Sequence, residues 1–445
     1  GIFLAAGFTS FAIQSLRERE MRAAGWSCGL AITCAFLFGG GVFAPLALQQ
    51  ILLGLTILAL TGATAAFFWP VEKVKRAREV PTRRFDERNI LFARSRLIAG
   101  SREFQQYYAD HPENLAADEA FRSRPGLLSP RAAFYHPILN ASPEASFFLT
   151  GALRDAVDGP VALQTVSSDP EKISSYLCGL TRYYGALDAG ITGLRPYHVY
   201  SHIGRGQGEW GAEIPVVHRY AIAFTVEMDF HMVAAAPYPP SIMESGRQYV
   251  EASRIGIQLA AAIRALGYSA RAHIDGNYQV IAPLVARDAG LGEIGRMGLL
   301  MTPENGPRVR LGVVTTDLPL VPDPAQDYSY MIDACNLCKK CAACCPSGSI
   351  PTDERKEIDG ALRWRINADT CFRYWCSIGT DCGRCLAVCP FSHPHHWTHT
   401  LIRRGIQHSG LFRRAALHLD DLFYGRKPPI KQAPGWTKIG GWNSK

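Results

Sequence analysis

Apolar side chains dominate the first seventy residues of the chain. Residues 23–71 contain no Asp, Glu, Lys or Arg, a run of 49 positions that is enough for two membrane-spanning helices of about 20 residues each. A break between them is expected at Phe43-Ala44-Pro45, because proline ends a helix. Residues 1–16 are uncharged too, although they are short for a full span. The pattern predicts about three transmembrane helices within residues 1–72.

Basic residues flank this apolar region, whereas the turn between the second and third predicted helices carries no charge. The flanking residues are Arg17, Arg19, Arg22, Lys73, Lys75, Arg76, Arg78, Arg83 and Arg84. Because positive residues are retained on the cytoplasmic side, we expect a multi-pass protein of the inner membrane with its catalytic part facing the cytoplasm. Arg83-Arg84 resembles a twin-arginine export signal, but no apolar segment follows it.

Beyond residue 72 the continuous apolar pattern gives way to periodic patterns. Residues 73–150 are mixed polar and basic and give few strong signals, so we treat them as a juxtamembrane unit. Strands are expected at residues 220–228, 278–285 and 309–314, where apolar residues alternate or cluster. These strands and an intervening helix predict an α/β (α+β) core over residues 151–330.

The intervening helix is expected at residues 248–266. Gly267 is placed to cap its C-terminus. The apolar residues that share one face of this helix are Ala252, Ile255, Leu259, Ile263 and Leu266, which is the spacing of an amphipathic helix packed on a sheet.

Cysteine spacing is the strongest chemical signal in the chain. Of 13 cysteines, eight occur in two runs that each end in Cys-Pro. The runs are Cys335-x2-Cys338-x2-Cys341-x3-Cys345-Pro346 and Cys371-x10-Cys382-x2-Cys385-x3-Cys389-Pro390. The first run is that of bacterial ferredoxins, in which three thiolates bind one 4Fe–4S cluster and the fourth binds another. A zinc or disulfide framework is the alternative, but zinc sites rarely carry paired Cys-Pro endings.

The ferredoxin rule assigns four cysteines to each of two 4Fe–4S clusters in a domain over residues 331–400. Cluster 1 would be bound by Cys335, Cys338, Cys341 and Cys389, and cluster 2 by Cys345, Cys371, Cys382 and Cys385. The other five cysteines do not fit this register and are treated as bystanders: Cys28, Cys34, Cys178, Cys344 and Cys376. Residues 401–445 form a basic, aromatic C-terminal tail. The net charge of +8 is modest for the length and favours a membrane surface over nucleic acid.

A longer segment before the cysteines points to a family. It reads Asp288-Ala-Gly-Leu-Gly-Glu-Ile-Gly-Arg296, continues through Gly306-Pro-Arg-Val-Arg310, and is followed by Thr316-Asp-Leu-Pro-Leu320. Its Gly-x-Gly-x-x-Gly spacing alone is weak evidence for a nucleotide loop, since no clear strand leads into it. With the two cysteine runs, Trp375, Pro390-Phe391 and Asp421-Leu-Phe-Tyr-Gly425, the segment resembles the corrinoid-dependent reductive dehalogenases over residues 130–430.

That resemblance implies a nitroreductase-like core that binds cobalamin, two 4Fe–4S clusters that supply electrons, and removal of halide from an organohalide. It also implies three site residues: Tyr249 as proton donor, Arg310 as its basic partner, and Asn277 as a polar residue near the substrate. A phenol stays protonated at neutral pH, and a nearby guanidinium stabilises the phenolate left after proton transfer. The simpler interpretations are a helix-surface phenol for Tyr249 and a strand-edge ion pair for Arg310.

The resemblance also bears on the histidines. A cobalt-ligating Asp-x-His-x-x-Gly motif is absent, since Asp229-Phe-His231 is followed by alanine at the glycine position. We therefore expect cobalamin in the base-off form without a histidine ligand. The histidines after the second cysteine run could bind a metal, but prolines favour a solvated or interfacial cluster; they are His393, His395, His396 and His399. Arg296 is expected to be structural.

Two other classes of function remain open. One is an enzyme of the epoxyqueuosine reductase type, which shares the cofactors and acts on transfer RNA. The other is a membrane-bound iron–sulfur electron carrier without catalysis. Typical respiratory dehalogenases are exported and held by a separate membrane protein, whereas here the helices are fused to the catalytic chain. The electron donor is expected to be a quinol or a ferredoxin-type protein, and the residues do not name the organohalide.

Overall fold

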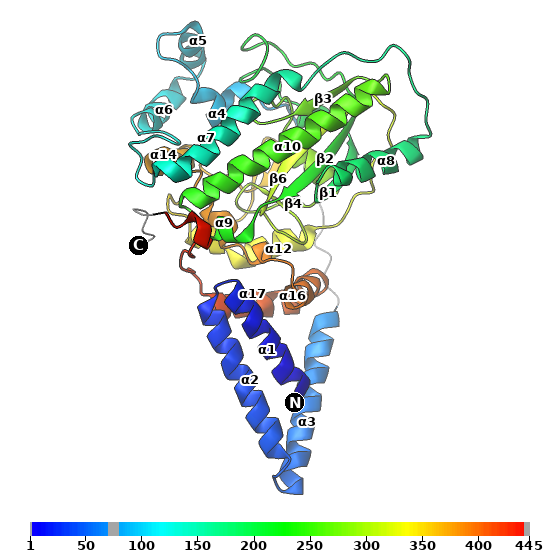
Figure 1. The fold of residues 1–445 in the computed structure, drawn as a ribbon, viewed down its shortest axis with the longest axis vertical. Coiled ribbons are helices and arrows are strands. Elements are labelled where there is room, and N and C mark those ends of the chain that lie inside the picture. Colours follow the sequence, from blue (N-terminus) through cyan, green and yellow to red (C-terminus); the bar gives the residue numbers. More distant parts are fainter. Residues whose placement is uncertain (1, 70–79, 440–445) are drawn as a thin grey trace.

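Three N-terminal helices project from one end of the molecule, and a β-sheet lies toward the other end (Figure 1). The computed structural model describes residues 2–69 and 80–439. The projecting helices are α1 (Ile2–Arg17), α2 (Met21–Gly41) and α3 (Leu46–Phe68). The predicted break at Phe43-Ala44-Pro45 is confirmed, because α2 ends and α3 begins on either side of it.

Helices α2 and α3 are long and apolar enough to cross a bilayer, whereas α1 is not. The 16 residues of α1 extend about 24 Å at 1.5 Å per residue, which is less than the hydrocarbon core of about 30 Å. The third predicted span, over residues 1–16, stays a prediction. Within the described residues two helices are candidate spans, and α1 packs along α2 instead. The predicted basic flank at Lys73, Lys75, Arg76 and Arg78 lies outside the described residues.

A four-stranded antiparallel sheet forms the centre of the body. In spatial order its strands are β1 (Asp188–Gly193), β2 (Tyr220–Glu227), β6 (Val309–Thr316) and β3 (Ala270–His273). The strands predicted at residues 220–228 and 309–314 are therefore confirmed. They are neighbours in the sheet, with Ala223 opposite Val313.

Alternate side chains of the central strands face two different helical layers, as the two-residue period of a strand requires. Ile222 and Val314 pack with Leu259 and Ile263 of α10 (Pro239–Ala265). The next residues along each strand pack instead with the apolar face of α11 (Ala282–Asp288). Helices on both faces of an antiparallel sheet confirm the predicted α+β core, while its nitroreductase-like character stays a prediction.

The long helix α10 begins nine residues earlier than the sequence pattern predicts. Two prolines, Pro239 and Pro240, open its first turn, where a missing backbone N–H costs nothing. Gly246 lies against α7 (Pro137–Ala152), and a Cβ there would approach Ser146 to 3.0 Å. This early portion therefore packs on a neighbouring helix rather than on the sheet. Its apolar residues do not continue the sheet-facing pattern of residues 252–266, so that pattern does not predict it. Its predicted end is confirmed, with Gly267 at φ +86°.

The strand predicted at residues 278–285 is wrong. Only Val280 pairs with another chain segment, in a single bridge to Val199. Helix α11 begins at Ala282 with a proline in its first turn, and a short apolar run cannot by itself distinguish a strand from a buried helix.

The remaining elements of the body precede the sheet, lie beside it or carry the cysteines. Before the sheet and beside it lie α4 (Leu91–Arg94), α5 (Arg102–Asp110), α6 (Leu115–Arg122), α8 (Pro170–Tyr183) and α9 (Phe230–Ala234). Two hairpins are formed by β4 (Glu293–Ile294) with β5 (Leu300–Met301) and by β7 (Lys356–Ile358) with β8 (Ala361–Arg363). The cysteines are carried on or beside α12 (Ser329–Cys338), α13 (Lys340–Ala343), α14 (Ala368–Ile378) and α15 (Arg384–Ala387).

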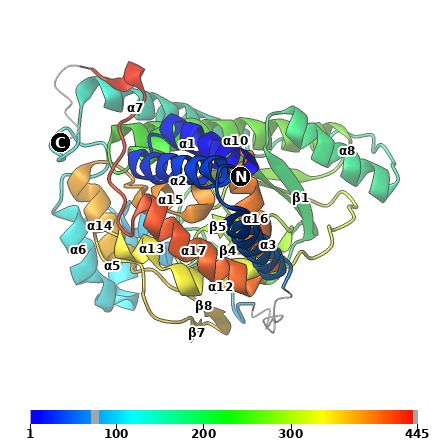
Figure 2. The same cartoon turned by 90° about the horizontal axis from the view of Figure 1, so that it is seen from below.

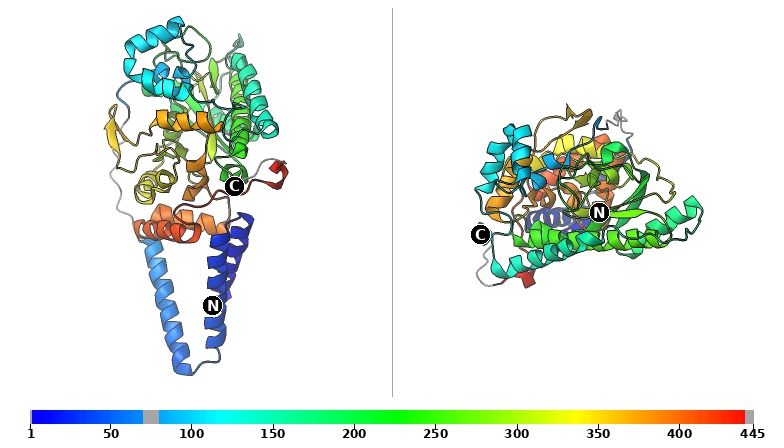
Figure 3. Two further views of the ribbon diagram at one scale, coloured as in Figure 1. Left: turned by 90° about the vertical axis from the view of Figure 1, so that its left-hand side faces the viewer. Right: turned by 90° about the horizontal axis from the view of Figure 1, so that it is seen from above.

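Two C-terminal helices separate the body from the projecting helices. They are α16 (Trp397–His408) and α17 (Gly410–Tyr424), and they lie across the tops of α2 and α3 (Figures 2 and 3). Both contact α3 and α12, and α17 also contacts α2. The cysteine-rich region is therefore connected to the N-terminal helices through this pair.

Candidate functional site

The two cysteine runs fold as two similar halves. In one half Cys338 is followed by Lys339 with φ +53° and then by helix α13; in the other Cys382 is followed by Gly383 with φ +70° and then by helix α15. Each left-handed residue turns the chain sharply between two cysteines, and each short helix supplies the next one. Helices α13 and α15 contact one another. The repeat seen in the cysteine spacing is thus also a repeat in backbone conformation.

One group of sulfurs gathers around Cys389. Burial raises the pKa of Cys389 well above its usual value, and the neighbouring Cys335, Cys338 and Cys341 reinforce the shift. Burial likewise raises the pKa of Cys338 and of Cys341 to about 12. Cys335, Cys341 and Cys389 are buried and Cys338 is partly buried, and a cationic iron cluster would supply the positive charge that their thiolate forms need.

A second group gathers around Cys385, whose pKa is also raised by burial and by neighbouring sulfurs. Its neighbours include Cys345, Cys371 and Cys382, and Cys341 of the first group lies close enough to contribute. The structure thus brings the predicted ligands together in the two sets of four that the ferredoxin rule assigns, with the sets adjacent. All-cysteine sets of four are what 4Fe–4S clusters require.

The extra cysteines near these groups make other contacts. The Cys344 thiol donates to the carbonyl of Arg426 at 3.6 Å. Cys376 packs in an apolar cluster with Leu91, Phe121 and Phe372. Both positions fit the prediction that these residues are bystanders.

A large cavity lies between the sheet and the second cysteine group. Its volume is about 1570 Å³, which exceeds the roughly 300–1,000 Å³ of pockets for drug-sized ligands. Cys345, Cys371, Cys382 and Cys385 line it, whereas the four cysteines of the first group do not. The second group is therefore the one next to the cavity.

Tyr249 and Arg310 line the same cavity from α10 and β6. The Arg310 guanidinium carbon lies 5.1 Å from the centre of the Tyr249 ring, within the range of a cation–π contact. The structure therefore brings together the predicted proton donor and its predicted basic partner.

Two further residues hold Arg310 in place. Its Nη2 donates to Ser245 Oγ at 2.6 Å and to Asp381 Oδ2 at 3.2 Å, and the serine hydroxyl also donates to Asp381. Ser245 lies one helical turn before Tyr249, and Asp381 immediately precedes Cys382. Sequence reasoning missed both, because Ser245 precedes residue 248, where the helix is predicted to begin, and Asp381 is distant from Tyr249 and Arg310 in the chain.

The environment of Tyr249 keeps its phenol protonated. Burial raises the pKa above its usual value of 10, and the Arg310 charge only partly opposes this shift. Nearby Asp275 and Asp381 raise the pKa further. A phenol with a raised pKa carries its proton throughout the neutral range and is available as an acid.

Asn277, the third predicted site residue, lies elsewhere. Its side chain is buried, accepts from Arg271 Nη2 at 2.8 Å and donates to the carbonyl of Arg154 at 3.1 Å. It is not among the residues that line the cavity, whereas its neighbours Asp275 and Tyr278 are. The structure thus places Asn277 in a network that joins chain segments, and does not bring it to Tyr249 and Arg310.

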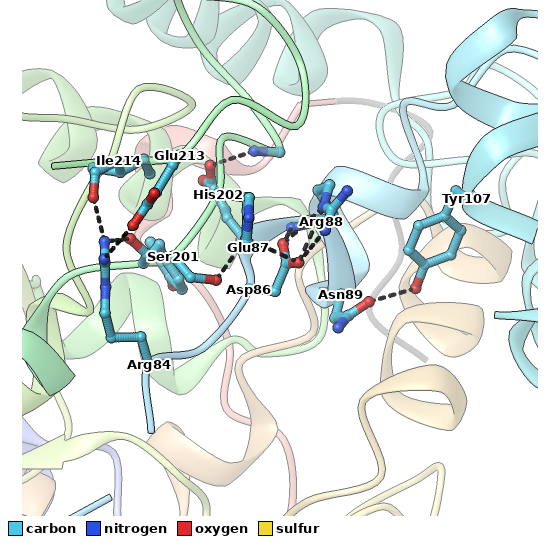
Figure 4. A network of polar contacts seen from close by, with 12 residues as sticks. Arg84, Asp86, Glu87, Arg88, Asn89, Tyr107, Ser201, His202, Glu213 and Ile214 are labelled. Atoms are coloured by element: carbon cyan, nitrogen blue, oxygen red, sulfur yellow. Dashed lines mark hydrogen bonds and ion pairs between the residues drawn. The ribbon is translucent and has the colours of Figure 1, made fainter. Parts of the chain in front are cut away.

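Residues 81–94 contribute to one wall of the cavity, and Figure 4 shows polar contacts that this segment makes. Arg84 donates to the carbonyl oxygens of Tyr200 and Ile214. The buried Glu87 carboxylate accepts from the backbone N–H of Gly204 at 2.9 Å, while Tyr107 donates to Asn89 Oδ1 at 3.0 Å. Because buried polar groups are costly unless paired, these contacts fix the wall. Of the Arg83-Arg84 pair noted in the sequence, Arg84 thus attaches this segment to the loop that carries Tyr200 and Ile214.

Three other features noted in the sequence lie outside the Tyr249–Arg310 pair. Arg296 is buried, donates to the carbonyls of Cys335, Pro351 and Asp353 at 2.7–3.1 Å, and so braces the first cysteine group, as expected. The glycine-rich segment around residues 290–295 leads from α11 into the β4–β5 hairpin, which differs from the strand-to-helix turn of a nucleotide loop. His231 lies on α9 and does not line the cavity.

The histidine group after the second cysteine run is not solvated as a whole. His393 and His399 are nearly buried, with side-chain exposures of 11% and 8%, and both contact Glu18. His395 remains exposed. The interfacial part of the prediction holds for the first two, because Glu18 belongs to the turn between α1 and α2.

Known proteins that resemble this chain include an iron–sulfur domain family and reductive dehalogenases. The 4Fe-4S dicluster domain family matches residues 334–393. A tetrachloroethene reductive dehalogenase of Sulfurospirillum multivorans is 35% identical over 227 residues, covering 49% of this chain and 45% of that protein. The chain therefore spans about half the length of the curated relatives it matches.

A solved structure shows the same fold. The catabolic reductive dehalogenase NpRdhA, in complex with 3-bromo-4-hydroxybenzoic acid, superposes with a TM-score of 0.64 at 24% identity, covering 80% of this chain and 49% of that one.

A second class of relative matches in sequence over a shorter segment. An epoxyqueuosine reductase of Listeria monocytogenes is 32% identical over 117 residues, which cover 25% of this chain and 29% of that protein.

The cysteine assignment predicts a difference between two thiols on one helix. Replacing Cys371 by Ser should lower the iron content by about half, from about eight to about four atoms per chain, because it removes one ligand of the second group. Replacing Cys376 by Ser is the matched control on α14 and should leave iron unchanged. Iron and acid-labile sulfide after anaerobic purification measure the effect. Equal iron in both variants would contradict the assignment.

Proposed function

We propose that the chain is a member of the reductive dehalogenase family, as its similarity to tetrachloroethene reductive dehalogenases indicates, and that it removes halide from an organohalide by two-electron reduction. The observation that carries this proposal is the cavity in which Tyr249 and Arg310 lie on one side and four cysteines of the second group on another. An electron source and a proton source thus share one cavity. Replacement of a carbon–halogen bond by a carbon–hydrogen bond consumes two electrons and one proton and releases halide.

A corrinoid is the cofactor that the family implies, and the cavity suits it in size and chemistry. Five buried polar atoms of its lining residues have no hydrogen-bond partner within the described chain, and two of them, Arg310 Nε and Asp381 Oδ1, belong to the ion pair beside Tyr249. Such atoms are rare in folded proteins and mark places where a ligand or water completes the bonding. When bound, cobalamin would supply the cobalt chemistry that activates the carbon–halogen bond. The absence of a histidine ligand to cobalt stays a prediction.

Tyr249 would deliver the proton in this reaction. Its raised pKa keeps the phenol protonated, and Arg310 would stabilise the phenolate that proton transfer leaves behind. Ser245 and Asp381 hold the guanidinium at the ring, so its position does not depend on the substrate. A fixed charge placed where negative charge develops is the arrangement that lowers a barrier most effectively.

Electrons would enter at the first cysteine group and leave from the second. Helix α12 carries Cys335 and Cys338 and contacts α16 and α17, which in turn contact α3. The first group therefore lies toward the projecting helices, and the second lies at the cavity. This order suits a donor at the membrane side, either a quinol or a ferredoxin-type protein.

We further propose that α2 and α3 anchor the chain in the membrane with the body on the cytoplasmic side. Both ends of this helix pair lie at the body: Arg22 near the start of α2 donates to the carbonyl of Leu422 at 2.9 Å, and Ser409 donates to the carbonyl of Ala66 near the end of α3. The uncharged turn at residues 42–45 is at the far tip (Figure 1). Arg17, Arg19 and Arg22 lie at the same end of the helix pair as the body, and the positive-inside rule identifies that side as cytoplasmic.

An apolar stripe on α17 supports this placement. It consists of the exposed residues Leu411, Ala415, Leu419 and Leu422. These residues recur every three or four positions, which is the pattern of a helix lying at a lipid surface. Since α17 contacts both candidate spans, the stripe lies where the membrane surface would be.

The two alternative functions are less well supported. Similarity to an epoxyqueuosine reductase covers a quarter of the chain, whereas that to the dehalogenases covers half. A pure electron carrier would not need a cavity of this size with a paired phenol and guanidinium.

Tyr249→Phe tests the proton donor. We expect loss of halide release by about 10²- to 10⁴-fold, the usual contribution of a general acid, with iron and cobalamin contents unchanged. In the unmodified protein, turnover should show no loss from phenol titration below pH 10, because the raised pKa keeps Tyr249 protonated there. Halide release from bromophenols and chloroalkenes provides the measurement. Turnover that survives the Phe substitution would exclude Tyr249 as the donor.

Arg310→Leu and Arg310→Lys distinguish the effect of the Arg310 charge on turnover from the effect of its side-chain packing. Removal of the charge eliminates the contribution that lowers the Tyr249 pKa, so the phenol becomes a weaker acid and turnover should slow at every pH at which it is protonated. Lysine keeps a charge at the ring but loses the planar fork, and should restore part of the rate. If the two variants differed only in thermal stability, the role of Arg310 would be that of a structural ion pair.

The topology is tested by reporter fusions. A reporter that works only in the cytoplasm should be active when it is attached after residue 80 and inactive when it is inserted at residues 42–45. A reporter that works only in the periplasm should give the reverse result. A periplasmic signal from the fusion after residue 80 would contradict the proposed orientation.

A further inference from the structure

Glu18, His393 and His399 meet where the N-terminal helices join the body. Glu18 lies in the turn between α1 and α2, His393 follows the second Cys-Pro step, and His399 is on α16. Glu18 Oε2 lies 2.9 Å from His393 Nδ1, and Glu18 Oε1 lies 2.8 Å from His399 Nε2. One donor atom from each of the three residues lies within 4.8 Å of the others.

This cluster is enclosed. The side-chain exposures are 2% for Glu18, 11% for His393 and 8% for His399. The two imidazole rings stack at 4.7 Å with an interplanar angle of 12°, and the Tyr424 ring lies 4.4 Å from that of His393. Gln14 also donates to Glu18 Oε1 at 2.8 Å, the oxygen that faces His399, and so helps to fix the carboxylate.

We propose that these three side chains bind a divalent first-row cation, of which zinc best fits the ligands. Two imidazole nitrogens and a carboxylate form the protein ligand set of many zinc sites, and a water completes such sites. Zinc–ligand bonds of about 2.0–2.2 Å separate tetrahedral donor atoms by about 3.3–3.6 Å. Each imidazole nitrogen lies closer than that to one oxygen of Glu18, at 2.9 Å for His393 and 2.8 Å for His399, so side-chain shifts of about 0.4–0.8 Å would admit the ion.

The charge balance of the cluster favours a cation. Within the described residues, Glu18 forms ion-pair contacts with the two imidazoles alone, while the nearby Lys431 is paired with Glu20. Burial lowers the pKa of His393 to about 3 despite its hydrogen bond to Glu18. Burial would raise the pKa of Glu18, but the hydrogen bonds from His393 and His399 outweigh it and keep the carboxyl ionised. An ionised carboxylate and a neutral imidazole are the forms that bind metals.

The position of the site indicates what the ion would do. It would link the turn between α1 and α2 to His393. His393 lies four positions after Cys389, which belongs to the first cysteine group. The ion would therefore hold the anchoring helices against the part of the body where electrons enter. This role does not depend on which substrate the cavity accepts, nor on the proposed dehalogenation.

Metal analysis of the full chain tests the proposal. The detergent-solubilised protein, purified anaerobically and exchanged against Zn²⁺ and then metal-free buffer, should retain about one zinc per chain in addition to its iron. Glu18→Gln and His399→Ala should each lose that zinc with iron unchanged. His395→Ala is the matched control, because His395 lies in the same segment but is exposed and outside the cluster, and it should keep the zinc. Absence of zinc from the unmodified protein, or equal zinc in all four proteins, would overturn the proposal.

A second measurement on the unmodified protein removes any dependence on how the variants fold. Zinc X-ray absorption should show nitrogen and oxygen neighbours at about 2.0–2.2 Å, with the multiple-scattering pattern of imidazole. Sulfur neighbours at about 2.3 Å would mean that zinc had entered the cysteine groups, and would overturn the assignment to Glu18, His393 and His399.

Discussion

The contact of Arg310 with Asp381 and Ser245 joins the parts of the molecule on which the proposed chemistry depends. Arg310 belongs to the central strand β6, Ser245 to helix α10, and Asp381 to the loop that carries Cys382. One buried guanidinium therefore ties the sheet, the helix of the phenol and the second cysteine group together. A buried charge is tolerated only when it is paired and hydrogen-bonded, so these three elements cannot separate without exposing it.

The arrangement of the chain extends this link to the opposite end of the molecule. The first cysteine group lies beside the second, α12 connects it to α16 and α17, and these helices lie on α2 and α3. The layers visible in Figure 3 thus follow the proposed course of the electrons, from the helices that anchor the chain to the cavity beside Tyr249. The Glu18, His393 and His399 cluster lies at the joint between anchor and body, where relative movement would alter the distance between an electron donor and the first cysteine group.

Local patterns in the sequence predicted much of this structure, because they depend on near neighbours. The cysteine spacing predicted two groups of four, and the alternation at residues 220–228 predicted β2. The break at Pro45 was equally clear. The errors arose where packing decides. Helix α10 extends back to Pro239 because Gly246 lets it approach α7, and the apolar run at residues 278–285 forms part of a helix because Pro283 lies in its first turn. Ser245, Asp381 and Glu18 gained their importance only from partners far away in the chain, which no local pattern reveals.

The most direct test of the account is the cobalt content of the complete protein, purified anaerobically from cells supplied with cobalamin. The account predicts about one cobalt per chain with corrin absorption, together with about eight irons. A protein that carried the iron but bound no corrinoid would contradict the account and would leave a membrane-bound electron carrier as its function.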